Sequence, residues 1–190
     1  MWNIAIFASG NGSNAENFFN YFKKNNEIKI SMVFCDNPQA YVIKRAQNHS
    51  IKCVEITRKQ LKDQDFMIKQ LEQNNINFIV LAGFLSKIPD FLVEKFEKKI
   101  VNIHPSLLPK YGGKGMYGHH VHQSVINNNE KFSGITIHFV NNVYDDGEII
   151  FQAKCPVLEN DTADSLAERV HKLEYQYFTT EIEKLLNSKA

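Results

Sequence analysis

Short apolar runs alternate with amphipathic segments through the first half of the chain, and this alternation limits the possible folds more than any other feature. The runs are rich in β-branched and aromatic side chains, which is typical of buried strands. Strands that alternate with helices form βαβ units. The sequence therefore predicts an α/β fold with a doubly wound, mostly parallel sheet. The expected strands are Asn3–Ala8, Ile28–Cys35, Lys52–Ile56, Phe78–Leu81 and Ile100–Ile103.

The segments between these runs have the spacing of amphipathic helices. In the first segment, Ala15, Phe18, Phe19 and Phe22 fall at positions i, i+3, i+4 and i+7, which places them on one face of a helix. Further helices are expected over Ala40–Ser50, Lys59–Asn74 and Asp90–Lys98.

The pattern changes after residue 130. Ser133–Val140 and Glu148–Cys155 are separated by the polar stretch NNVYDDG, which predicts a late pair of antiparallel strands. Asp161–Leu186 has the composition of a long C-terminal helix, with Thr162 as its N-cap. At 190 residues the chain suits a single domain.

Composition argues against several classes of protein. The formal net charge is +1 and no long basic run occurs, so no nucleic-acid partner is expected. The apolar N-terminal run is too short for a membrane span and lacks the charged flank of a signal peptide, so no membrane partner is expected. The cysteines Cys35, Cys53 and Cys155 are isolated, which fits a reducing cytoplasm and provides no zinc motif.

The stretch ASGNGSNAE, residues 8–16, joins the first strand to the first helix. Gly10 and Gly12 allow backbone amides to approach an anion closely, and the helix N-terminus favours phosphate. Ser13 is expected to cap the helix, with Glu16 completing a capping box. Ala15 replaces the third glycine of a dinucleotide fingerprint, so a phosphate monoester is favoured over a nucleotide. The alternative is an ordinary tight strand-to-helix turn.

The stretch NIHPSLLP, residues 102–109, lies where a parallel strand ends, and ligands of open α/β sheets bind at that edge. Strand alternation places Asn102 and His104 on one face, with Ile103 on the other. An amide beside an imidazole can hold a developing oxyanion and move a proton. The alternative is a histidine that only closes the strand.

Two further stretches carry polar chemistry. In YDDGE, residues 144–148, an aspartate placed against His104 would fix its tautomer, although Asp-Gly also suits a plain β-turn and the choice between the two aspartates stays open. In GHHVHQ, residues 118–123, His120 and His122 are two apart and would lie on different faces of a helix. No HExxH motif or cysteine partner accompanies them, so no metal is expected.

These pieces occur together and in order: SGNGSN after the first strand, Ala82-Gly83-Phe84, NIHPSLLPKY at 102–111, and a late D-x-G turn followed by IFQAKCPV. In this combination the chain resembles the phosphoribosylglycinamide formyltransferase family, over nearly its whole length. The resemblance implies a Rossmann-like formyltransferase fold. It also implies a cytoplasmic transferase of one-carbon metabolism and purine biosynthesis. Such an enzyme moves a formyl group from 10-formyltetrahydrofolate, a co-substrate, to the amine of glycinamide ribonucleotide.

The resemblance also assigns residues. It implies catalytic roles for Asn102, His104 and Asp145, phosphate binding by Gly12, Ser13 and Asn14, and substrate contacts at Gly83 and Glu174. It places the folate against Phe84, Leu85, Ile88, Asn141, Val143 and Tyr144. Residues 1–100 would then form the half that binds the phosphorylated substrate, and residues 101–190 the catalytic and folate-binding half.

The expected mechanism needs no protein nucleophile, because the substrate amine attacks the formyl carbon directly. Protonated His104 and the Asn102 amide would stabilise the oxyanion of the tetrahedral intermediate. Asp145 would keep His104 charged and help to pass the amine proton to the folate nitrogen, and the glycine-rich loop after Pro109 would close over the reacting groups.

Alternative functions stay open. They are another enzyme of the fold that uses 10-formyltetrahydrofolate, either a formyltetrahydrofolate hydrolase or a sugar-nucleotide formyltransferase, and a non-catalytic module that binds a phosphate ligand. A methionyl-tRNA formyltransferase is not expected, because it would need a further C-terminal domain beyond Ala190; a hydrolase would usually carry a further N-terminal one. The expected partners are small molecules alone, for a monomer or weak homodimer.

Overall fold

The computed structural model describes residues 1–188, which fold into two compact units. Unit 1 contains Met1–Val101 and the end of the last helix from Leu186, and unit 2 contains Asn102–Leu185. Strand β5 (Ile100–His104) crosses the boundary. The seven strands of the sheet follow the order β3-β2-β1-β4-β5-β6-β7.

Unit 1 contains the parallel part of the sheet, as the sequence predicted. Strand β1 pairs in parallel with β2 and β4, and β2 pairs in parallel with β3. The strands are β1 (Trp2–Phe7), β2 (Ile28–Cys35), β3 (Lys52–Glu55) and β4 (Phe78–Leu81). Every side chain from Ile4 to Ala8 is fully buried, because helices cover both faces of such a sheet.

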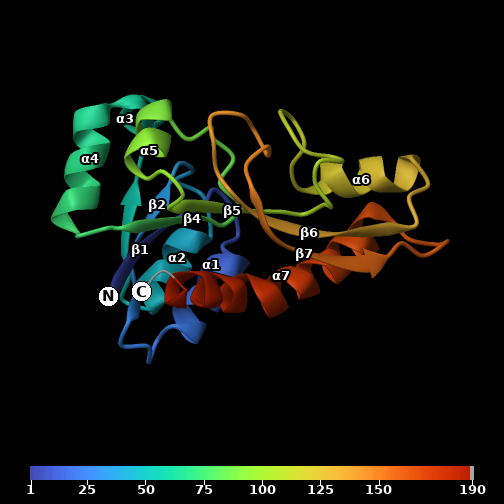
Figure 1. Cartoon of the computed structure of the whole chain (residues 1–190), viewed down its shortest axis with the longest axis horizontal. Coiled ribbons are helices and arrows are strands. Elements are labelled where there is room, and N and C mark those ends of the chain that lie inside the picture. The colour runs from blue at the N-terminus through green and yellow to red at the C-terminus, as the bar shows by residue number, and fades with distance from the viewer. Residues whose placement is uncertain (189–190) are drawn as a thin grey trace. The chain divides into compact units, whose positions relative to one another are not determined.

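The helices of unit 1 lie on opposite sides of its strands. Figure 1 shows α1 and α2 on one side and α3, α4 and α5 on the other. This arrangement follows from right-handed crossovers, since the chain moves outward from β1 to β3 and then returns to β4. The helices are α1 (Ser13–Tyr21), α2 (Val42–Asn48), α3 (Arg58–Lys62), α4 (Gln64–Gln73) and α5 (Asp90–Lys95).

The single helix expected over Lys59–Asn74 is wrong, because the chain breaks it at Asp63. That residue has extended dihedrals, φ −83° and ψ 104°, and ends α3. Its side chain accepts a hydrogen bond of 3.0 Å from the Phe66 N–H and so begins α4. An aspartate inside a helical pattern therefore acted as an N-cap.

Unit 2 contains the antiparallel strand pair and the long helix, both as predicted. Strand β6 (Phe132–Phe139) pairs with β7 (Ile149–Pro156), and Ile137 lies opposite Phe151. Helix α7 (Ala163–Asn187) runs alongside these strands in Figure 1, and the Phe151 and Tyr177 rings lie 5.0 Å apart. Thr162 caps the helix, since its side chain accepts from the Ser165 N–H at 3.2 Å.

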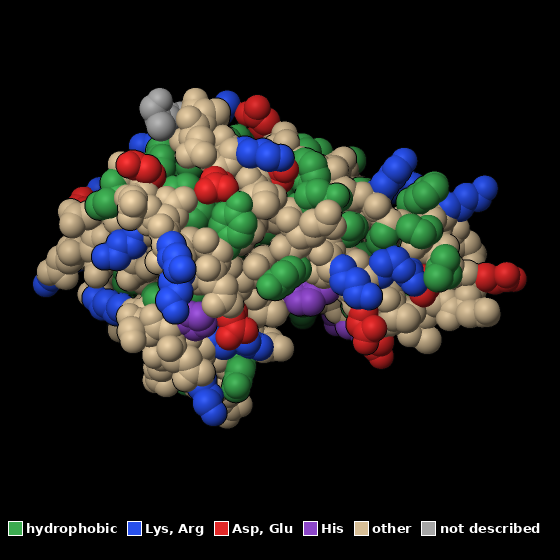
Figure 2. All heavy atoms as spheres, turned by 90° about the horizontal axis from the view of Figure 1, so that it is seen from below, with side chains coloured by type: hydrophobic (Ala, Val, Ile, Leu, Met, Phe, Trp, Pro, Cys, Tyr) green, Lys and Arg blue, Asp and Glu red, His purple; other side chains and the backbone are tan. Residues whose placement is uncertain are grey.

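Helix α6 (His119–Asn127) is the remaining element of unit 2, and its bounds were not predicted. On the surface, basic and acidic side chains are interspersed over the face shown in Figure 2, consistent with 22 Lys and Arg against 21 Asp and Glu in the whole chain. In the described part of the chain, no helix combines the length and apolar character that crossing a membrane requires.

Candidate active site

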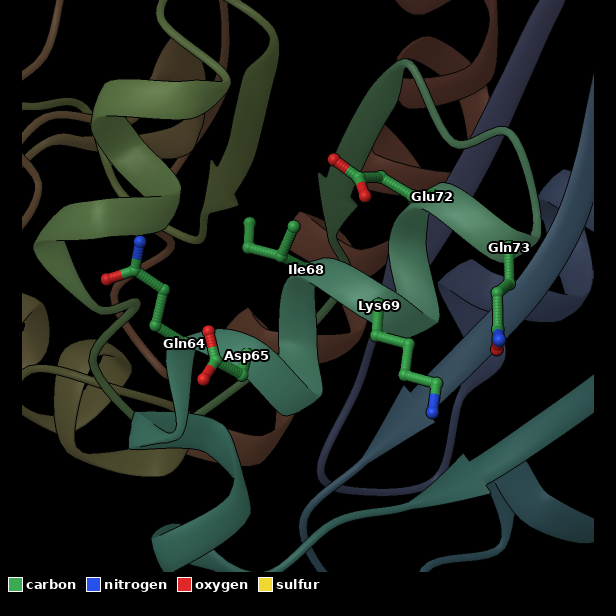
Figure 3. A pocket seen from close by; sticks show the side chains of 6 residues that line it. All are labelled: Gln64, Asp65, Ile68, Lys69, Glu72 and Gln73. Atoms are coloured by element: carbon green, nitrogen blue, oxygen red, sulfur yellow. The ribbon is translucent and has the colours of Figure 1, made fainter.

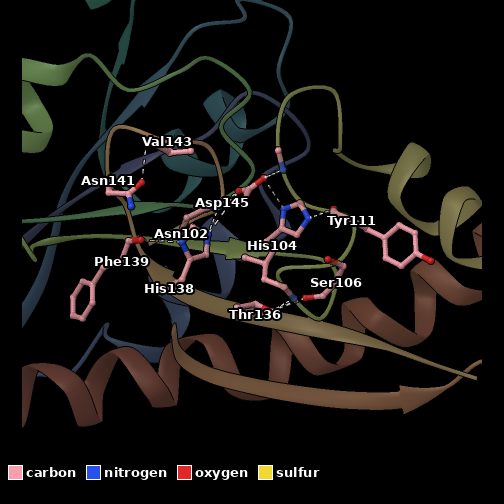
Figure 4. A network of polar contacts seen from close by, with 12 residues as sticks. Asn102, His104, Ser106, Tyr111, Thr136, His138, Phe139, Asn141, Val143 and Asp145 are labelled. Atoms are coloured by element: carbon pink, nitrogen blue, oxygen red, sulfur yellow. Dashed lines mark hydrogen bonds and ion pairs between the residues drawn. The ribbon is translucent and has the colours of Figure 1, made fainter. Parts of the chain in front are cut away.

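The end of strand β5 presents two polar side chains from an otherwise apolar strand. Val101 and Ile103 are buried in the core, whereas Asn102 and His104 both face Asp145. The Asn102 Nδ2 lies 3.4 Å from Asp145 Oδ1, and the His104 Nδ1 lies 3.5 Å from Asp145 Oδ2 (Figure 4). The structure thus brings the three side chains predicted to be catalytic together around one carboxylate, all within unit 2.

The two ring nitrogens of His104 both meet acceptors. Its Nε2 lies 2.7 Å from the carbonyl oxygen of Tyr111, and a carbonyl can only accept, so this nitrogen carries a proton. The Nδ1 faces the Asp145 carboxylate. The ring is only 4% exposed. A buried imidazole with an acceptor at each ring nitrogen is held in one orientation.

Asp145 is positioned by an unusual backbone. Its φ of 54° is in the left-handed region, which aspartate adopts more readily than most residues. Its Oδ2 accepts a 2.9 Å hydrogen bond from the Gly113 N–H. The turn needs Gly147, because a Cβ there would lie 1.8 Å from the Phe139 carbonyl oxygen. Of the two aspartates in YDDGE, Asp145 therefore faces the cluster, whereas Asp146 is exposed.

His138 is a fourth member of this cluster that the sequence analysis missed. It lies on β6 and is 2% exposed, with Nε2 3.1 Å from Asn102 Nδ2 and 3.7 Å from Asp145 Oδ1. Burial lowers the pKa of His138 below its ordinary value, which favours the neutral ring. The available signal was the alternation of SGITIHFV, in which Thr136 and His138 are polar positions on one face of the strand.

A buried hydrogen-bond network holds the chain that follows His104. The Thr136 hydroxyl donates to the Ser106 carbonyl at 2.7 Å and accepts from the Leu108 N–H at 3.0 Å. The Gln152 amide donates to the Leu108 carbonyl at 3.0 Å. Strands β6 and β7 therefore fix the path by which the chain leaves β5.

Glu130 anchors the next part of the same segment. Its Oε1 accepts hydrogen bonds from Lys110 Nζ at 2.7 Å and from the Tyr111 hydroxyl at 3.0 Å. These bonds lower the pKa of Glu130, with Lys110 contributing most. The carbonyl that accepts the hydrogen bond from His104 thus belongs to Tyr111, whose own side chain is held by Glu130.

Two histidines, His122 of α6 and His171 of α7, interact with the predicted substrate contact Glu174. His122 is 5% exposed, and burial lowers its pKa. His171 Nδ1 lies 2.9 Å from Glu174 Oε2, and this hydrogen bond raises the pKa of His171. Among residues 1–188, no group of three or more histidine, cysteine or acidic side chains is arranged to hold a metal ion.

The glycine turn of unit 1 differs in detail from the prediction. Helix α1 begins at Ser13, and its N-cap is Gly12 with a left-handed φ of 75°. The predicted Ser13 cap is therefore wrong, since Ser13 is the first helical residue. Glu16 does not complete a capping box but pairs with Arg45 of α2. Gly12, Ser13 and Asn14 nevertheless occupy the first turn of α1, where backbone N–H groups lack helical partners.

The residues predicted to contact folate and amine differ in exposure. In unit 1, Gly83 is exposed with φ 77° and Leu85 is 57% exposed, whereas Ile88 is buried and Phe84 packs against Phe7 with 5.2 Å between ring centroids. In unit 2, Val143 and Tyr144 are exposed, and the Asn141 side chain accepts from the Val143 N–H at 2.9 Å.

Two surface hollows, one in each unit, are lined by residues other than those predicted for the site. One of about 270 Å³ on helix α4 is shown in Figure 3, and no residue predicted for the site lines it. It is lined by Gln64, Asp65, Ile68, Lys69, Glu72 and Gln73. Another, of about 410 Å³ in unit 2, includes Lys110, Tyr111 and Glu130 among its lining residues.

Comparison with known proteins identifies the class of enzyme to which this fold and the cluster at the end of β5 belong, the transferases that move a formyl group. Residues 2–182 match the family described as Formyl transferase. The chain belongs to this family.

Several relatives are named as one particular enzyme within this family. The chain is 36% identical to "Phosphoribosylglycinamide formyltransferase" of Bacillus subtilis, over 98% of this chain and 95% of that protein. It is 53% identical to the chloroplastic enzyme of that name from Vigna unguiculata, although this match covers 46% of this chain and only 28% of the relative. A crystal structure of phosphoribosylglycinamide formyltransferase from Anaplasma phagocytophilum matches with a TM-score of 0.89 and 32% identity, covering 99% of this chain and 88% of that one.

Proposed function

We propose that this protein is a phosphoribosylglycinamide formyltransferase, which transfers the formyl group of 10-formyltetrahydrofolate to the primary amine of glycinamide ribonucleotide in purine biosynthesis. The observation that carries the proposal is the buried cluster in which Asn102 and His104 both lie against Asp145. A module that only binds a phosphate ligand has no need of a held proton-transfer pair.

The proposed chemistry is acyl transfer without a covalent enzyme intermediate. The amine nitrogen attacks the formyl carbon, and the C=O electrons move to the oxygen to give a tetrahedral oxyanion. When this intermediate collapses, the C–N bond to the folate breaks and the amine proton ends on the folate nitrogen. His104 supplies positive charge beside the oxyanion, and Asp145 orients its ring and takes part in the proton transfer.

The phosphate of the substrate is assigned to the first turn of α1 in unit 1. Gly12, Ser13 and Asn14 place backbone N–H groups there, and the helix dipole favours an anion at that end. The left-handed φ of Gly12 turns the chain into the helix without a side chain in the way. In unit 2, Glu174 is assigned to the ribose, and in unit 1 Gly83 is assigned to the neighbourhood of the amine.

Folate-contacting residues are proposed in each unit separately. Leu85 in unit 1 and Val143 and Tyr144 in unit 2 are exposed apolar side chains, which suit the flat face of a pteridine. Asn141 shapes the turn that carries Val143. Within unit 1, Phe84 packs on Phe7 and Ile88 is buried, so these two residues support the backbone on either side of Leu85.

The remaining proposals concern cellular context. Both substrates are small molecules. We place the enzyme in the cytoplasm as a monomer or weak homodimer that acts without a metal, a nucleic acid or a membrane.

A two-substrate assay tests the proposal. Purified protein is mixed with 10-formyltetrahydrofolate and glycinamide ribonucleotide, and release of tetrahydrofolate is followed by its absorbance. We expect release only when both substrates are present. Release with folate alone would identify a hydrolase, and release only with an amino-sugar nucleotide would identify a different acceptor; either result would overturn the proposal.

A further inference from the structure

The contacts of Asn102 determine which end of its side-chain amide is available to a substrate. Its Nδ2 lies 3.1 Å from His138 Nε2 and 3.4 Å from Asp145 Oδ1. A carboxylate oxygen can only accept a hydrogen bond, so the group beside it must be the amide NH₂. The orientation of the amide then depends on whether the other neighbour, His138 Nε2, also accepts.

Whether His138 Nε2 accepts follows from the contact of the other ring nitrogen, Nδ1. Its Nδ1 lies 2.9 Å from the carbonyl oxygen of Phe139, which can only accept, so Nδ1 carries the proton of the neutral ring. The ring is 2% exposed, and its burial disfavours a second proton. Nε2 therefore presents a lone pair, and it accepts from Asn102.

We propose that His138 is a positioning residue that, together with Asp145, fixes the Asn102 amide so that its oxygen is offered to the attacking amine of the substrate. Both N–H bonds of Asn102 are then committed to acceptors within the protein, one to His138 and one to Asp145. The inference rests on the proposed formyl transfer for its chemical meaning, but the hydrogen-bond arrangement follows from the contacts and burial of Asn102 and His138 and does not depend on that function.

This arrangement gives Asn102 a role different from that of an oxyanion donor. Its Oδ1 accepts an N–H of the substrate amine, which aims the nitrogen lone pair at the formyl carbon. As the new C–N bond forms, the nitrogen becomes positively charged, and an acceptor oxygen stabilises that charge more than it stabilised the neutral amine. Stabilisation of the oxyanion is left to His104.

Two charged groups near His138 act on its pKa in opposite directions. The Asp145 carboxylate, 3.7 Å from Nε2 and beyond hydrogen-bond range, raises the pKa of His138, but burial lowers it by more. His104 acts on His138 through space, and a positive charge there disfavours a second one on His138. A cation at His104 and a neutral ring at His138 are therefore compatible on either side of Asp145.

Two substitutions at His138 separate the proposed role from simple packing. Glutamine can place an oxygen near the position of Nε2 and accept from Asn102, whereas leucine fills similar space without an acceptor. We expect His138→Gln to retain kcat within about threefold and His138→Leu to lower kcat by about 10²-fold, the scale expected for a misplaced reacting group, with little change in either KM. A kcat near the wild-type value for folded His138→Leu would overturn the proposal.

A double-mutant cycle tests whether His138 acts through Asn102. In an Asn102→Ala background, His138→Leu should produce almost no further loss of kcat, because the group that it positions is already gone. Full additivity of the two losses would contradict the proposal.

A spectroscopic measurement decides the point even where His138→Leu does not fold or formyl transfer is not observed. In protein labelled with ¹⁵N-histidine, the His138 ring should appear at pH 7 as the neutral tautomer protonated at Nδ1, assigned by its loss in His138→Gln. A ring protonated at Nε2 would reverse the orientation of the Asn102 amide and overturn the inference. Absence of formyl transfer by the wild-type protein would instead count against the proposed function.

Discussion

The cluster around Asp145 in unit 2 and the glycine turn at the start of α1 in unit 1 are built in opposite ways. The cluster is made of side chains, and its members are held by hydrogen bonds to β6 and to the segment after β5. The turn is made of backbone, and its shape depends on the left-handed Gly12. Proton transfer needs titratable side chains held in fixed positions, whereas backbone N–H groups alone can bind an anion.

The largest expected effect comes from removing the charge at the centre of the cluster. We expect Asp145→Asn to lower kcat by about 10²–10⁴-fold, because the amide offers one acceptor where the carboxylate serves Asn102, His104 and the Gly113 N–H. The matched control is Asp146→Asn, which changes the exposed neighbour in the same way and should leave kcat within about twofold. Equal effects of the two substitutions would show that the cluster has no special role.

A substitution in the turn should act on binding and stability rather than on chemistry. A Cβ at Gly12 would lie 2.5 Å from Val42, and the φ of 75° is unfavourable for alanine. We expect Gly12→Ala to raise the KM for the phosphorylated substrate by at least about tenfold and to lower Tm by several degrees, from roughly 1–3 kcal/mol of strain.

Gly10→Ala is the stability control for that substitution, because a Cβ at Gly10 would meet no atom within 4 Å. Its Tm should remain close to that of the wild-type protein in a thermal melt. An equal loss of Tm in both variants would show that the left-handed conformation of Gly12 is not the cause.

Asp161 is a second carboxylate held by hydrogen bonds, but it has no part in the proposed chemistry. Arg169 donates to both of its oxygens, at 2.6 and 2.9 Å, and holds the pKa of Asp161 well below its usual value of 3.8. Asp161→Asn should lower Tm at pH 7 by about 2–4 °C while kcat stays unchanged.

The pH dependence of that stability follows from the direction of the shift. Because the folded pKa is depressed, the stabilisation is present above pH 3.8 and is lost as the pH falls through the folded pKa. The Tm difference between wild type and Asp161→Asn should therefore shrink in acid. A difference that is constant from pH 7 down to the acid limit would contradict this assignment.

The smallest effect is expected from the pair formed by His171 and Glu174, in which the histidine is half exposed. Glu174 raises the pKa of His171 above 6.5, so this pair stabilises the fold below pH 6.5 and the stabilisation is lost as the pH rises through the folded pKa. The His171 side chain is half exposed, which limits the gain to about 0–1 kcal/mol. His171→Gln should therefore lower Tm slightly at pH 5.5 and not at pH 9, and the reverse order would refute the pairing.

Local pattern was enough to predict most elements of the fold and several members of the cluster. The alternation of apolar runs located all of the parallel strands, and the position of Asn102 and His104 at a strand end pointed to the site. His138 was missed because its partner Asn102 is 36 residues away, a pairing that only the sheet creates.

Two errors arose where several local interpretations were possible. Asp63 was read as part of a helix although it begins one, and Ser13 was read as a cap although Gly12 takes that position. In both cases a residue that suits helix N-termini was assigned from type and spacing alone, whereas the backbone path of the folded chain decided its position. The choice of Asp145 over Asp146 likewise depended on the turn that Gly147 permits.

The most direct test of the central claim is the turnover number of His104→Ala with both substrates at saturation, measured together with its Tm. If His104 supplies charge to the oxyanion, kcat should fall by about 10²–10³-fold while the protein remains folded. Turnover close to that of the wild-type protein in a well-folded variant would contradict the account.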